Sequence, residues 1–133
     1  MSALRNHSRP AGDRGEVSVE HLLLVPAMFL TCLLAVQGAL WFHAGNVAGS
    51  AASRAALAGA ARDGTAGAAQ AVARQVVASD GGTLAGDPLV TRTPTTVNVR
   101  VEVSVPRLVP FVPASVGRSV SAAVERFVPE PER

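Results

Sequence analysis

The sequence has little of the residues from which disulfide frameworks, metal sites and aromatic cores are built. Its 133 residues include one cysteine, no tyrosine and an aromatic content of only 4%. The single cysteine, Cys32, excludes an internal disulfide framework and any metal site with several cysteine ligands. A hydrophobic content of 48% therefore rests on Ala and Val, and hardly on the large rings that dominate most soluble cores.

Histidine is also scarce, and its positions argue against the usual catalytic and metal-binding arrangements. His7 lies in a polar N-terminal stretch, whereas His21 and His43 lie at opposite ends of an apolar run. Beyond His43 the chain has no histidine and no cysteine, so no base is available there for a Ser/His pair. The carboxylates of this later part of the chain are scattered along the sequence. Its glycines do not have the spacing of a phosphate-binding loop. We expect no enzyme activity, no metal and no cofactor.

Lysine is absent, because all 12 basic residues are arginine. The formal net charge is only +2, and no basic stripe alternates with aromatic residues as in nucleic-acid-binding surfaces. With the abundant Ala, Gly and Pro, this indicates a compositional bias. We expect no nucleic-acid partner.

The most prominent feature of the sequence is a long apolar run. Residues 21–42 carry no formal charge and read HLLLVPAMFLTCLLAVQGALWF. As a helix they would span roughly 30 Å, the thickness of a hydrocarbon core. A buried helix of a soluble protein is a weak alternative, because the run is apolar around its whole circumference. Since Trp41, Phe42 and His43 suit a membrane–water interface, we predict a transmembrane helix at about 21–42.

The arginines predict the orientation of that helix. Arg5, Arg9 and Arg14 precede the run, and the first basic residue after it is Arg54. The positive-inside bias places the N-terminus in the cytoplasm and residues 44–133 outside the plasma membrane.

Residues 1–15 are polar and without period, so we expect a disordered cytoplasmic leader. A cleaved secretory signal is the alternative. Its apolar core would usually be shorter, and the nearest small-x-small sites, around residues 36–39, lie inside the run.

An alanine-rich stretch follows the run and completes a second region, residues 16–64. Gly45, Gly49 and Ser53 form a small-xxx-small row in it. The row is either part of an alanine-rich helix extending from the membrane or a packing face against sister helices, and the sequence leaves both open. An unbroken helix would run from about residue 17 to residue 62.

Residues 65–133 are expected to form a small extracytoplasmic α+β domain. Helical spacing of Ala and Val predicts a second helix at 66–79. Strict alternation of valine in TVNVRVEVSV, residues 96–105, predicts a strand. Residues 115–128 fit a returning strand or a helix, of which we favour the strand, and 89–93 fit a third short strand.

The predicted sheet is therefore an antiparallel hairpin or has three strands. A domain of this size with so few rings is marginal alone, so its stability must come from its own long helix or from partners.

Glu16 and Glu20 lie just before the apolar run, where charged side chains are unexpected and require an explanation. One interpretation is a helix N-terminus, where carboxylates interact favourably with the positive end of the dipole. The other starts from spacing: after a cut behind Gly15, Glu16 becomes the first residue and Glu20 the fifth. A glycine, a glutamate at the fifth following position and a membrane-length apolar run are similar to the processing signal of type IV pilin-like proteins.

Three features extend this similarity: RGEVSVE (14–20), a proline six positions past the glutamate, Pro26, and the later segment ARDG (61–64). With them the chain resembles the TadE-like family, pseudopilin-like proteins of the tight-adherence pilus assembly system. The resemblance covers residues 14–64 well and the valine-alternating and closing strands loosely. Glu16 departs from it, because pilins usually carry an apolar residue at the first mature position.

The resemblance implies a function and roles for particular residues. A prepilin peptidase would cut between Gly15 and Glu16, and Glu20 would pair with the new α-amino group of a neighbouring subunit. The expected function is a single-pass pseudopilin-like protein that assists pilus or secretion-machine assembly by helix packing, with sister subunits and assembly proteins as partners. The alternative is a membrane-anchored extracytoplasmic binding or structural module without a pilus role.

Overall fold

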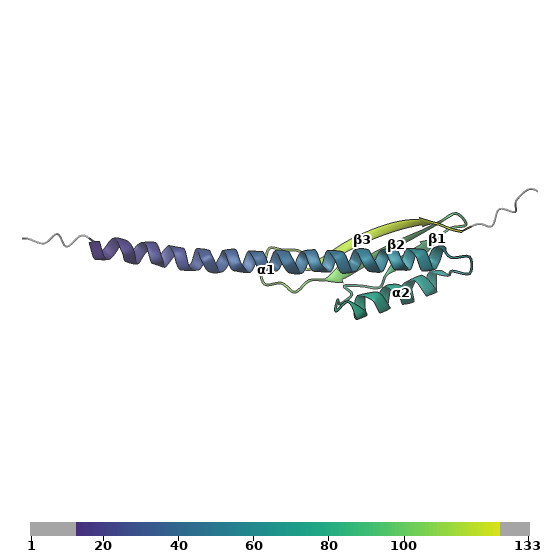
Figure 1. Ribbon diagram of the computed structural model, residues 1–133, viewed down its shortest axis with the longest axis horizontal. Helices are drawn as coiled ribbons and strands as arrows, with labels where there is room; N and C mark the ends of the chain where they lie inside the picture. The colour runs from purple at the N-terminus through teal and green to yellow at the C-terminus, as the bar shows by residue number, and fades with distance from the viewer. Residues whose placement is uncertain (1–12, 126–133) are drawn as a thin grey trace, which may run out of the picture. The chain divides into compact units, whose positions relative to one another are not determined.

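The protein consists of a long helix, a short helix and a three-stranded sheet. The computed structural model describes the backbone of residues 13–125 and the side chains of residues 20–125. In chain order the elements are α1 (Asp13–Ala60), α2 (Ala66–Ser79), β1 (Leu89–Arg92), β2 (Thr96–Ser104) and β3 (Ser115–Ala123) (Figure 1). The expected α+β class is confirmed, and the sheet has three strands.

The chain divides into two compact units, and the division falls within α1. One unit ends at Ala35 and the other begins at Val36. The described part of the first unit is the N-terminal portion of α1 alone. The second, here called the packed unit (residues 36–125), contains the rest of α1, α2 and the sheet.

Helix α1 is 48 residues long, and its bounds are close to those expected from the sequence. It is rich in Ala and Leu, which have the highest helix propensities. Pro26 lies inside it and has no N–H, so the carbonyl of Leu22 lacks its usual intrahelical donor. Membrane helices tolerate such prolines more readily than soluble ones do.

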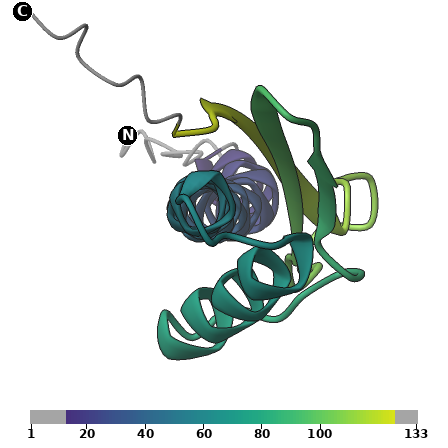
Figure 2. The same ribbon diagram turned by 90° about the vertical axis from the view of Figure 1, so that its right-hand side faces the viewer.

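The sheet is antiparallel, with β2 between β1 and β3. Val99 is paired with Val90 of β1 and with Val120 of β3. The four valines of β2 are at most 1% exposed, whereas the residues between them face away from the core. Figure 2 shows α1 and α2 on the same face of the sheet. The packed unit therefore has two layers, with the valine face of β2 inside.

Two strands that the sequence indicated less clearly are also present. The segment at 115–128 is a strand over Ser115–Ala123, so the favoured interpretation is confirmed and the helical one is wrong there. Residues 126–128 lie outside the described part of the chain. The third strand is confirmed at Leu89–Arg92, and α2 has the predicted bounds.

The core joins short side chains of α1 to the valines of β2. Helix α1 buries a row spaced by three and four residues, which places all its members on one helix face. The row consists of Ala44, Val47, Ala48, Ala51, Ala52, Ala55, Ala56 and Ala60. Helix α2 contributes Ala69, Ala73, Val76 and Val77. The sequence indicated that the small domain would be stabilised by its own long helix or by partners. The long helix is part of this core, so it is one source of that stability.

A tight link at residues 61–65 joins the two helices and contains the ARDG segment. The N–H of Gly64 donates to the carbonyl of Ala61 at 2.8 Å. A Cβ at Gly64 would collide with the carbonyl oxygen of Ala58 and lie 2.7 Å from that of Gly59. Only glycine fits this position, because backbone atoms cannot move aside as a flexible side chain can.

The C-terminal carbonyls of α1 are satisfied from two other parts of the packed unit. Arg92 Nε of β1 donates to the carbonyl of Gly59 at 2.9 Å, and the N–H of Glu125 donates to that of Ala60 at 3.0 Å. Helix ends leave such acceptors without intrahelical donors. These bonds fix the end of α1 to the sheet.

We predict that Gly64→Ala destabilises the packed unit by about 1–3 kcal/mol, because the added methyl group has no room. Gly67→Ala is the matched control, since its Cβ would meet only Thr65 Oγ1 at 4.0 Å. The control should leave stability unchanged or raise it by up to about 1 kcal/mol. Thermal unfolding of the full chain in detergent micelles, followed by circular dichroism, measures both. Equal stability of Gly64→Ala and the wild type would contradict this account of the link.

Candidate functional site

The most unusual surface of the molecule is the stretch of α1 that leads into the packed unit. From Leu22 to Val36, here called the apolar segment, the large hydrophobic side chains are 42% to 74% exposed. They include four consecutive residues, 22–25, which point in different directions around the helix. Burying each such side chain would contribute about 1.5–3 kcal/mol. The segment therefore requires apolar surroundings on all sides.

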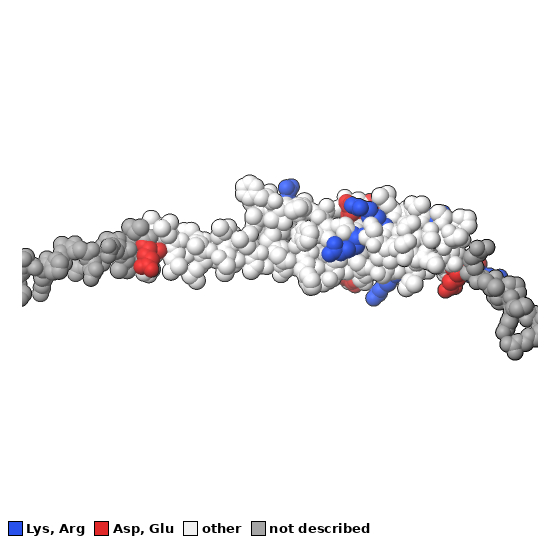
Figure 3. Space-filling model, turned by 90° about the horizontal axis from the view of Figure 1, so that it is seen from above, with Lys and Arg blue, Asp and Glu red and all other residues white. Residues whose placement is uncertain are grey.

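Polar atoms within the apolar segment suit such surroundings. Thr31 Oγ1 donates to the carbonyl of Ala27 at 2.8 Å, so its hydroxyl is satisfied by the helix itself. No Asp, Glu or Arg occurs between Glu20 and Arg54, and the stretch is white in Figure 3 on the face drawn there. Within residues 20–125, α1 is the one helix long and apolar enough to cross a membrane. This suggests membrane anchoring.

A buried amide marks the point where the apolar segment meets the packed unit. Gln37 is only 3% exposed. Its Nε2 donates to the carbonyl of Pro106 at 3.2 Å, and its Oε1 accepts from the N–H of Leu108 at 2.8 Å. Both partners belong to the β2–β3 connection at residues 106–113, here called the proline loop. The amide therefore holds this loop against α1.

The structure places the predicted processing and pairing residues at the start of α1. Gly15 and Glu16 lie in its first turn. Glu20 lies one turn further along and has an exposed side chain. Only His21 separates it from the apolar segment, so its carboxylate stands where the helix changes from polar to apolar sequence.

The small-residue row of α1 faces the chain's own sheet where it is buried. A Cβ at Gly45 would lie 3.2 Å from Arg118 Nη2 and 3.6 Å from Val116 Cγ1. One at Gly49 would lie 4.0 Å from Arg118 Cγ. The two glycines therefore leave space for an arginine side chain of β3. Ser53 is exposed, and contact of this row with a second helix stays a prediction.

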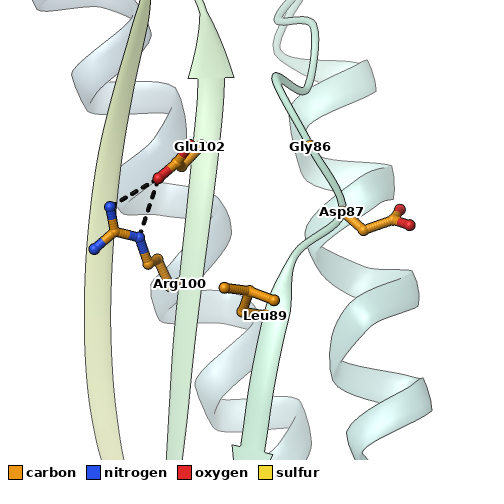
Figure 4. Close-up of a pocket in the computed structure, with 5 residues that line it drawn as sticks. All are labelled: Gly86, Asp87, Leu89, Arg100 and Glu102. Atoms are coloured by element: carbon orange, nitrogen blue, oxygen red, sulfur yellow. Dashed lines mark hydrogen bonds and ion pairs between the residues drawn. The ribbon is translucent and has the colours of Figure 1, made fainter.

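A shallow pocket of about 230 Å³ lies on the outer side of the sheet, and Figure 4 shows it. Arg100 Nη2 and Glu102 Oε1 of β2 are 2.7 Å apart in it. Asp87 points away from that pair and contacts Arg74 Nη2 of α2 at 3.0 Å. These charges are already paired within the chain. Residues 20–125 hold no group of three or more His, Cys, Asp or Glu side chains that could bind a metal.

The fold and the apolar segment define a class of protein in which one long helix carries an exposed apolar segment and continues into the core of an α+β unit. Within that class, residues 15–66 match the family model described as TadE-like protein. The match starts at Gly15 and ends just after the link between α1 and α2. It confirms the resemblance carried by RGEVSVE and ARDG. No curated protein and no solved structure matches the chain.

The sequence did not predict that Gln37 contacts the proline loop. The available signals were a lone amide in an otherwise apolar run and three prolines between two strands. The amide signals a polar partner, because an unpaired amide in an apolar setting is unfavourable. Nothing local identifies that partner, which lies about 70 residues later in the chain.

We predict that Gln37→Ala loosens the proline loop, because the carbonyl of Pro106 and the N–H of Leu108 lose their partners. A buried group left unsatisfied costs about 1–3 kcal/mol, so amide exchange at Leu108 should accelerate roughly 5- to 150-fold. Hydrogen exchange of the full chain in micelles measures this, with Gln75→Ala, an exposed glutamine of α2, as the control. If exchange at Leu108 is the same in both variants, the amide does not hold the loop.

Proposed function

We propose that the protein is a single-pass, pseudopilin-like component of a tight-adherence type pilus or a related secretion machine. Residues 1–15 are cytoplasmic in this proposal, the apolar segment lies in the plasma membrane and the packed unit is extracytoplasmic. The observation that carries the proposal is an exposed, all-round apolar helix inside a TadE-like match. The arginines before the helix support the orientation.

In this proposal the protein works by helix packing and not by chemistry on a substrate. Its exposed apolar side chains contact lipid or the corresponding helices of sister subunits and assembly proteins. The packed unit buries the alanines of α1 against its own sheet, so it remains folded whether or not the membrane helix has a partner. Such an arrangement suits a subunit that is first stored in the membrane and then transferred to an assembly.

Processing by a prepilin peptidase between Gly15 and Glu16 is the next step. The first turn of a helix has N–H groups without intrahelical acceptors, so unwinding it breaks few hydrogen bonds. Glycine also lowers helix stability there by roughly 1 kcal/mol relative to alanine. The bond lies in that first turn of α1, which supports local opening into a cleavable form.

Glu20 then acts in subunit pairing. A carboxylate next to the hydrocarbon is unfavourable unless a cation accompanies it. Cleavage creates an α-amino group at Glu16, and the same group on a neighbouring subunit supplies that cation. Pairing neutralises two charges at the edge of an apolar region, which favours adjacent packing of two processed helices over isolated ones.

We predict that the N-terminus found in membranes is Glu16. Mass spectrometry of the protein purified from membranes of its native host reads the terminus directly. Replacing Gly15 with a bulky residue should leave the leader attached, because the peptidase recognises the glycine. An intact leader in the wild-type protein would instead favour the alternative, a membrane-anchored envelope module without a pilus role.

We predict that Glu20→Ala leaves membrane insertion intact but weakens co-purification with other pilus components roughly tenfold. Polar pairs in membranes are worth about 1–2 kcal/mol, and about 1.4 kcal/mol corresponds to a factor of ten. Glu125→Ala removes an exposed carboxylate from the packed unit and is the control. Quantitative pull-down from membranes measures the effect. Unchanged co-purification of Glu20→Ala would count against charge pairing.

A further inference from the structure

The proline loop exposes large apolar side chains at the end of the packed unit where α1 enters it. Phe111 is 93% exposed and Leu108 is 46% exposed. The loop is closed at its base, where the N–H of Val105 donates to the carbonyl of Ala114 at 2.7 Å. In Figure 1 this β2–β3 connection crosses α1 in projection, and the bonds of Gln37 tie its base to the helix. A fixed loop therefore carries an apolar tip.

The bonds of Gln37 fix the loop at a defined level of the helix. Its two hydrogen bonds hold Pro106 and Leu108 at the first turn of α1 that belongs to the packed unit. Leu40, one turn later on the same helix face, is partly buried against the core. The loop thus flanks α1 directly after Val36, the last residue of the apolar segment.

The apolar segment is too short to cross a membrane by itself, so the position of the proline loop along α1 matters for the span. From Leu22 to Val36 the helix rises roughly 22 Å, which is shorter than a hydrocarbon core of about 30 Å. About five further residues, up to Trp41, are needed to complete the span. Those residues are flanked by the proline loop, so a full span brings the loop into the outer boundary of the membrane.

The chemistry of the loop fits that location. Pro106, Pro110 and Pro113 have no N–H to leave unsatisfied in a region with little water. The N–H of Leu108 is bonded to Gln37, and that of Val112 donates to the carbonyl of Val109 at 3.4 Å.

Arg107 is exposed on the same loop. A long arginine side chain there can reach lipid phosphates while its aliphatic part lies on apolar surface.

We propose that the proline loop is a second membrane contact, in which Phe111 and Leu108 insert into the lipid leaflet that faces the packed unit. Arg107 binds lipid headgroup phosphate beside them. The inference rests on the proposed membrane span of α1. It adds that the packed unit itself contacts the bilayer through this loop.

Tryptophan fluorescence with brominated lipids tests the contact. The probe is Phe111→Trp in a Trp41→Phe background, so that position 111 carries the single tryptophan. The full chain is reconstituted in vesicles of phosphatidylcholine and phosphatidylglycerol with bromine either near the headgroup or deep in the acyl chain. We expect a blue-shifted emission and a loss of intensity that is larger with the shallow bromine.

Two matched variants separate the loop contact from the span. Leu89→Trp, on exposed β1, should keep water-like emission and no quenching. Leu30→Trp, in the apolar segment, should be quenched by the deep bromine. Quenching at position 30 without quenching at 111 overturns the loop contact and leaves the span standing. No quenching at position 30 overturns the span and the loop contact together.

Dilution of the protein in the same lipid separates lipid from protein as the occupant of the loop. A blue shift at position 111 without bromine quenching, lost at low protein-to-lipid ratio, would show that a second copy covers Phe111. That result also overturns the proposal. Quenching that persists at all ratios supports insertion into the leaflet.

Discussion

The close approach of α1 to the valine face of β2 is the constraint on which the rest of the packed unit depends. Alanines spaced by three and four residues form the contacting helix face, and four valines of β2 are buried in the core that this face shares with α2. Short side chains on the helix allow branched ones on the strand to fill the space between the layers. This explains how a core with so few rings exists, and why Gly45 and Gly59 carry no side chain: Val97 Cγ1 lies 3.0 Å from a Cβ built at Gly59.

The same helix is both the core element and the candidate anchor. One face of its second half is buried against the sheet and α2, and residues 22–36 are exposed and apolar. Because the core requires the second half, loss of packing between α1 and β2 would unfold the unit and not simply release a tether. The buried amide of Gln37 stands at the change from one environment to the other, where it exchanges contact with lipid for contact with a polar backbone.

Prediction from sequence succeeded where one period dominated a segment. Valine at every second position of β2 fitted only a strand, and the apolar run of α1 fitted only a helix. The segment at Ser115–Ala123 was ambiguous because Val116 and Val120, four residues apart, share a face in a strand and in a helix. Pairing with β2 decides for the strand, since Val120 lies opposite Val99 and Val116 opposite Val103. That pairing joins residues far apart in the chain, so no local pattern contains it.

The sequence alone determined the helix, the central strand, the α2 bounds and the TadE-like motif around Glu20, because each depends on residues that are neighbours in the chain. Only the tertiary structure showed that Gly45 and Gly49 lie under Arg118, and that Gln37 holds the proline loop. A small residue in the sequence indicates that another group approaches the backbone closely, and a lone amide indicates that it has a hydrogen-bonding partner. Which group that is depends on how the chain returns to it, and that is decided by the antiparallel pairing of β2 with β3 and the packing of both on α1.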